Sequence, residues 1–145
     1  MKKVMTMILV FAVMAGGCAT SGERSAGDRI ESGVRAAATI GTYEALTERP
    51  DWAVAFDTAR QELIEIAAAD RIDFYLVYGI VNRLPVNELK SDRAVVYITA
   101  ATLLLEEAGR PSVDLDGVEV LRPAVMGLIT GIEQGMRLAG VREDQ

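Results

Sequence analysis

Carboxylates are the main chemistry-bearing side chains of this chain, because histidine is absent and the only cysteine is Cys18. Without histidine there can be no Ser-His-Asp or Cys-His catalytic arrangement and no histidine-bearing metal site. The side chain that most often serves as a general base near neutral pH is missing as well. The sequence therefore predicts a protein that is not an enzyme, with no catalytic residues, no metal site and no cofactor.

One group of acids partly matches a calcium-binding loop, with Asp114 and Asp116 followed by Gly117. An EF-hand loop needs an acidic ligand at its twelfth position, and counting from Ser112 that position is Pro123. A solvated loop with a helix cap explains these acids better, and weak calcium binding is the alternative.

Two pairs of adjacent residues have side chains of types that occur in catalytic sites. Lys90 and Ser91 have the composition of a Ser-Lys dyad, but adjacent side chains rarely face each other and Ser91 is expected to cap a helix. The neighbouring acids Glu106 and Glu107 are expected at a solvated helix end. An enzyme that uses carboxylates alone would need two acids meeting in a cleft.

The N-terminal segment has the three-part pattern of a secretory signal peptide. Two lysines at positions 2 and 3 precede the apolar run Val4–Ala15, and two glycines follow it. The run is about a dozen residues long, whereas a helix needs about 20 to cross a bilayer. We therefore expect residues 1–17 to be a leader rather than a permanent transmembrane span.

The residues Ala15-Gly16-Gly17-Cys18 resemble the lipobox of bacterial lipoproteins, with Ala15 where that family usually has leucine. The resemblance implies that the cysteine sulfur receives a diacylglycerol, that the leader is removed, and that Cys18 becomes an N-terminus acylated on sulfur and nitrogen. A lone free thiol is a liability in an exported protein, which also favours Cys18 as the lipidation site. The alternative is an ordinary signal peptide followed by an incidental thiol.

Lipidation would determine where the protein resides. Two or more acyl chains anchor a protein stably, at about 0.8 kcal/mol per buried methylene. Ala19 is not the aspartate that the family associates with inner-membrane retention, so we expect an outer-membrane anchor facing the periplasm. The leader holds two of the 15 basic residues and none of the 21 acidic ones, which leaves a formal charge of −8. That balance argues against nucleic acid and anionic lipid as partners, so membrane attachment would come from the acyl chains.

The remaining chain predicts an all-α fold, a single bundle of about five helical segments joined by short connections. We expect a lipidated N-terminus and tether over residues 18–27, a helical domain over 28–140 and a tail over 141–145. Helices are expected over 28–48 with Asp28 as the cap, over 52–69, over 74–83 and from Ser91 to Gly109. For the last helix, Pro123 predicts either a kink or a start near that residue.

Apolar spacing predicts which faces are buried. The first helix has a stripe of mostly small residues: Ile30, Val34, Ala37, Gly41 and Ala45. The second has a stripe of larger ones: Trp52, Phe56, Ala59, Leu63 and Ile66. The third is apolar almost all round, which predicts burial, and the run Ala94–Leu105 is expected in the middle of the bundle.

The glycines Gly127, Gly131 and Gly135 recur at every fourth position of the last helix. Each glycine costs a helix about 0.5–1 kcal/mol relative to alanine, so a compensating interaction is expected. Close packing against another helix of the bundle is one interpretation. The others are a docking strip for a partner and the wall of an apolar cavity.

The domain resembles small helical bacterial and phage-derived lipoproteins of unknown function. The motifs are Arg49-Pro50-Asp51, Leu89-Lys90-Ser91 and Arg122-Pro123, within Ala36–Gly140. We expect a membrane-anchored envelope lipoprotein whose non-enzymatic domain binds a protein partner or has a structural role. The alternative is a carrier of an apolar ligand or lipid in a cavity between helices.

Overall fold

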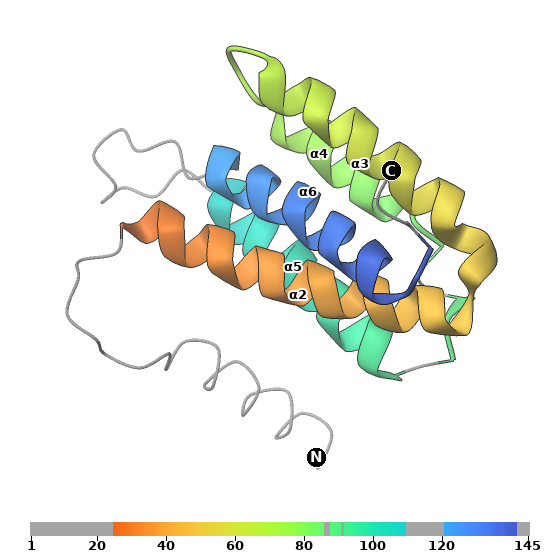
Figure 1. Ribbon diagram of the computed structural model, residues 1–145. Helices are drawn as coiled ribbons and strands as arrows, with labels where there is room; N and C mark the ends of the chain where they lie inside the picture. The colour runs from red at the N-terminus through yellow and green to blue at the C-terminus, as the bar shows by residue number, and fades with distance from the viewer. Residues whose placement is uncertain (1–24, 86–87, 91, 110–120, 142–145) are drawn as a thin grey trace.

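The computed structural model describes residues 25–85, 88–90, 92–109 and 121–141 (Figure 1). All regular structure in these ranges is helical, which confirms the all-α bundle. The elements are α2 (Ala26–Glu48), the 3₁₀ turn η1 (Pro50–Trp52), α3 (Ala53–Ala68), α4 (Phe74–Asn82), α5 (Asp92–Gly109) and α6 (Leu121–Leu138). The predictions for Cys18, for the cap at Ser91 and for the loop of Asp114, Asp116 and Gly117 lie outside the described residues.

Helix α2 begins earlier than the sequence suggested, because Ser25 and not Asp28 is its N-cap. The Asp28 amide donates to Ser25 Oγ at 3.1 Å, and the Ser25 amide donates to Asp28 Oδ2 at 3.2 Å. This reciprocal capping box satisfies amides that the first helical turn leaves without partners. Asp28 is therefore the third helical residue, and the helix begins at Ala26, within the segment predicted as tether.

The middle of the bundle is α2, not the apolar helix α5 as predicted. Helices α5 and α6 pack on two sides of α2, and its predicted stripe is buried at Val34, Ala37, Gly41 and Ala45. By contrast, α5 fully buries only Ala94, Ala101 and Leu105. The small residues of α2 let two helices approach it at once, and this leaves α5 on the outside with one face covered.

The glycine strip of α6 lies directly against the backbone of α2. A Cβ atom at any of the three glycines would approach an α2 carbonyl oxygen to 2.7 Å or less. The successive contacts are Gly127 with Glu31, Gly131 with Arg35, and Gly135 with Thr39. Both partners advance by four residues at each step, so α2 and α6 run in the same direction, as Figure 1 shows.

Helix α5 crosses the other side of α2 in the opposite direction. Gly41 makes room for Ile98, whose Cγ1 would lie 2.6 Å from an added Cβ. One end of this contact is closed by Glu48, which accepts the Lys90 amide at 2.7 Å. Toward the other end Gly33 lies against Leu104. Glycines on α2 and α6 therefore set both close contacts of the central helix.

Helix α3 covers α6 and is the amphipathic helix that the sequence predicted, with Phe56, Ala59 and Leu63 buried. Its C-terminal end is held by Arg122, which donates from Nη1 to the carbonyl of Ala67 and from Nη2 to that of Ala69 at 3.0 Å. An arginine at this position satisfies carbonyls that have no partner within the helix. Pro123 lies in the first turn of α6, so the prediction that this helix begins near it is confirmed.

The corner between α2 and α3 is built from the motif Arg49-Pro50-Asp51. Arg49 donates from Nε to Asp51 Oδ1 at 3.0 Å and from Nη2 to Oδ2 at 2.7 Å. Its guanidinium carbon lies 4.6 Å from the centroid of the buried Trp52 ring. A bidentate ion pair and a cation–π contact therefore support the proline turn.

We expect Gly131→Ala to destabilise the protein by about 1–3 kcal/mol, because its Cβ would lie 2.6 Å from Ala38 Cβ and 2.7 Å from the Arg35 oxygen. Gly79 in α4 is the matched control, since nothing lies within 4 Å of an added Cβ there. Gly79→Ala should stabilise by about 0.5–1 kcal/mol through helix propensity. Urea unfolding of both variants measures the difference, and equal effects would contradict the close contact.

The corner also predicts a perturbed titration. The hydrogen bond from Arg49 lowers the pKa of Asp51 below its ordinary value of 3.8. The resulting stability is present above pH 3.8 and is lost as the pH falls through the lower pKa of the folded state. Carboxyl NMR titration should show the pKa of Asp51 rising in Arg49→Gln. An unchanged value would mean that the ion pair does not form in solution.

Candidate functional site

The largest departure from the sequence prediction is α4, which is not buried all round. Its inner face buries Val77, Ile80 and Val81. On the outside, Tyr75 is 81% exposed and Leu76 is 58% exposed. The run is apolar on every side, but only one side of this nine-residue helix is covered by the bundle. Exposed apolar residues that lie together, unlike single ones, mark interaction surfaces.

Four residues in the first turns of α4 form what we call the α4 aromatic face: Phe74, Tyr75, Leu76 and Tyr78. The Phe74 ring lies 5.6 Å from that of Tyr75 in an edge-to-face arrangement and 5.6 Å from that of Tyr78 in a stacked one. The helix is positioned by Asp73, which accepts the Tyr75 amide at 2.8 Å as the N-cap. Tyr75 and Leu76 are the exposed members, whereas Phe74 and Tyr78 are half-buried, and the contact with the Phe74 ring helps to fix the Tyr75 ring in place.

The α4 aromatic face lies at the end of the bundle where α2 begins, which we call the Ser25 end (Figure 1). Three contacts place it there. Phe74 packs against Gly109, the last residue of α5. Arg122 donates to the carbonyls that precede α4, including that of Asp70 at 3.3 Å. The next residue, Pro123, lies against Gly27 in the first turn of α2. The aromatic face therefore lies near the residues where the folded domain begins.

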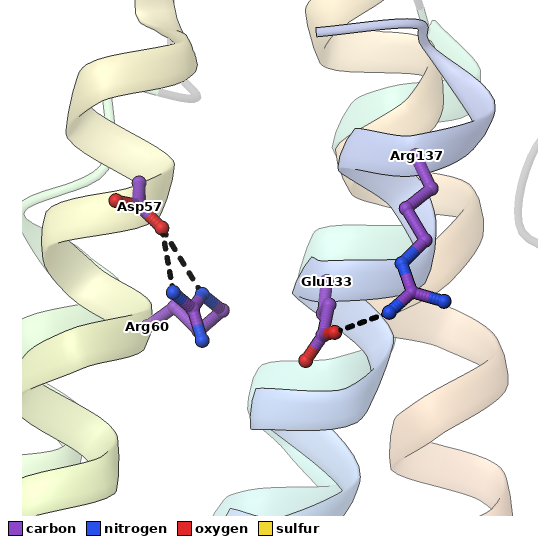
Figure 2. Close-up of polar contacts among 4 residues, drawn as sticks. All are labelled: Asp57, Arg60, Glu133 and Arg137. Atoms are coloured by element: carbon purple, nitrogen blue, oxygen red, sulfur yellow. Dashed lines mark hydrogen bonds and ion pairs between the residues drawn. The ribbon is translucent and has the colours of Figure 1, made fainter. Parts of the chain in front are cut away.

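A second feature that the sequence did not reveal is the buried charge of Arg60. Its side chain is only 6% exposed and donates from Nε and Nη2 to Asp57 Oδ1 at 3.1 and 2.9 Å. Figure 2 shows the pair projecting from α3 toward α6. A buried guanidinium needs such an acceptor, because an unpaired charge in the interior is strongly destabilising.

The close-up also shows a pair along α6, in which Arg137 donates to Glu133 at 2.7 Å (Figure 2). Both carboxylates thus face an arginine of their own helix, at i,i+3 or i,i+4 spacing. In the described ranges, no three Asp, Glu, His or Cys side chains come together as they would to hold a metal ion. These four residues have the arrangement of structural ion pairs, with each acid neutralised.

The predicted glycine strip is an internal contact with α2, and this position gives a partner no access to it. A depression of about 320 Å³ lies beside α2 at Asp28, Glu31, Ser32 and Arg35. It is open and mainly polar, which is unlike the apolar cavity of a lipid carrier.

Residues of both pairs that the sequence suggested for catalysis lie in structural positions. Lys90 donates its backbone amide to Glu48. Glu106 and Glu107 lie in the last two turns of α5.

No protein-family model matches the chain, and no curated protein or solved structure is significantly similar to it. None of the helices in the described ranges is long and apolar enough to cross a membrane.

The sequence contains only weak signals for the exposure of Tyr75 and Leu76 and for the burial of Arg60. Tyr75 and Leu76 belong to an apolar run in which no polar position marks the outer side. Arg60 follows Ala59 on the buried stripe of α3, and its acceptor is only three residues before it. The spacing of Asp57 and Arg60 permits an i,i+3 pair, but nothing local shows that the arginine is buried.

We expect Asp57→Ala to destabilise the protein by about 1.5–3 kcal/mol, because it leaves a buried guanidinium without its carboxylate. Arg60→Met removes the charge and keeps the apolar stem, so its effect should be smaller. Glu133→Ala, in the more exposed pair on α6, is the control and should change stability by about 0.5 kcal/mol or less. Thermal or urea unfolding measures all three. A larger loss in Arg60→Met than in Asp57→Ala would contradict this account.

Proposed function

We propose that this chain is an envelope lipoprotein, anchored in the outer membrane by acyl chains on Cys18, whose helical domain has a non-enzymatic role. The observation that carries the proposal is the position of the single cysteine, after an apolar leader and seven residues before the Ser25 cap of the first helix. A lipid on that sulfur would tether a domain that begins almost immediately afterwards.

The short spacing between anchor and domain supports this reading. Seven residues at no more than about 3.5 Å each span at most about 25 Å. The domain would therefore stay within one domain diameter of the bilayer. A protein held so close to a membrane is suited to binding a second envelope protein or to a structural role there.

The chemistry of the described surface supports a non-enzymatic role. Three arginines hold a helix end or pair with an acid: Arg49 with Asp51, Arg60 with Asp57, and Arg122 with the end of α3. Among the described residues, the α4 aromatic face presents accessible apolar surface at Tyr75 and Leu76. Apolar surface is suited to binding and not to acid–base catalysis.

The anchor predicts a defined mass and location. Intact mass spectrometry of the native protein should give the mass of the chain from Cys18 onward plus a diacylglycerol and an N-linked acyl chain. In Cys18→Ala the lipid mass should disappear, the leader should no longer be removed by the lipoprotein route, and the mature form should leave the outer-membrane fraction.

Ala19→Asp is the matched control, because it alters the neighbouring residue and leaves the sulfur intact. It should keep the lipid mass and move the protein to the inner membrane. An unmodified thiol on protein recovered outside the membrane fractions would overturn the proposal.

A further inference from the structure

We propose that the α4 aromatic face lies in the headgroup region of the bilayer that holds the acyl chains, so that the domain contacts the membrane at a second point. This inference rests on the lipid anchor proposed above. The partner that covers the α4 aromatic face is the surface of a bilayer with zwitterionic headgroups.

The position of the α4 aromatic face favours contact with the membrane. The face lies at the Ser25 end, the end that the tether joins, through the contacts of Phe74 with Gly109 and of Pro123 with Gly27. The 23 residues of α2 separate this end from the opposite one by about 34 Å. The tether spans at most about 25 Å, so the Ser25 end is the end held nearest the acyl chains.

The side chains of the α4 aromatic face are of types that suit a membrane surface. Tyrosine has an apolar ring with a polar tip, and it is enriched where membrane and water meet. Tyr75 stands out from the domain with Leu76 beside it, while the opposite side of α4 is fixed in the core by Val77 and Val81. The helix therefore presents a rigid apolar ridge, and little conformational freedom is lost on insertion.

The charges near the start of α4 favour a zwitterionic surface over an anionic one. In the described segment just before α4, the exposed charges are Asp70, Arg71 and Asp73, which do not form a basic patch. Binding driven by apolar burial requires no anionic lipid and is insensitive to salt, unlike attraction by polybasic segments. Since the anchor already holds the domain at the surface, even weak insertion suffices, as for any second contact made within one molecule.

The test places one nitroxide spin label at a time on the lipidated full-length protein in phosphatidylcholine vesicles. Leu76→Cys carries the label in the aromatic face. Val54→Cys is the matched control, because Val54 is apolar, 76% exposed and located in the first turn of α3 at the opposite end of the bundle. Cys18 does not react with the label when its sulfur carries the diacylglycerol.

The ratio of oxygen to nickel-chelate accessibility reports the depth of each label. We expect this ratio to rise severalfold at position 76 on reconstitution, to a depth of about 5–10 Å as for other interfacial helices. It should stay at its aqueous value at position 54 and be unchanged in 0.5 M salt (about a 4–5 Å screening length).

Each other outcome overturns the inference. Equal, water-like ratios at both positions would show that α4 faces solvent. Dipolar broadening at position 76 would identify a second copy as the occupant, and a change only after adding solubilised envelope proteins would identify a protein. Flotation with the vesicles and the intact mass test the anchor separately. Protein that floats with its lipid but has a water-exposed label refutes only this inference, whereas protein without lipid refutes the anchor and the inference together.

Discussion

The close approach of two backbones, α2 and α6, is the constraint on which the rest of the bundle depends. Three glycines, one per turn of α6, lie against three carbonyl oxygens, one per turn of α2. The glycines lie against the α2 main chain and against the side chains of Val34, Ala38 and Thr42, so dispersion contacts form along the whole line. Glycine lowers helix propensity at each position, and the packing that its missing Cβ permits offsets that loss.

The positions of the other helices follow from this pair. Because α2 also has a glycine at position 41, α5 approaches it closely from a second side, around Ile98. Helix α3 then covers α6, and α4 closes the gap between α3 and α5. No described helix packs on the outer side of this nine-residue helix, and Tyr75 and Leu76 are exposed there. The apolar surface of the domain is thus a consequence of where the tight contacts are made.

Arginine connects the parts of this acidic protein. Arg122 holds the end of α3 to the start of α6, Arg49 braces the turn after α2, and Arg60 carries a charge into the contact between α3 and α6 with Asp57 beside it. A guanidinium suits these roles because its planar fork donates several hydrogen bonds in fixed directions. With these cations used in holding the fold together, the proposed activity depends on an acylated cysteine and an apolar face.

The sequence by itself determined the all-α class, the number of helices, the buried stripe of α3 and the start of α6 near Pro123, because helical periodicity and caps are local properties. The reciprocal pairing of Ser25 with Asp28 is also local, but it begins the helix before the expected cap. Only the tertiary structure decided that α2 and not α5 is central, that Arg60 is covered, and that α4 has an exposed side. Periodicity shows which residues share a face, whereas burial depends on which neighbours reach that face, and that is set by contacts between residues far apart in the chain.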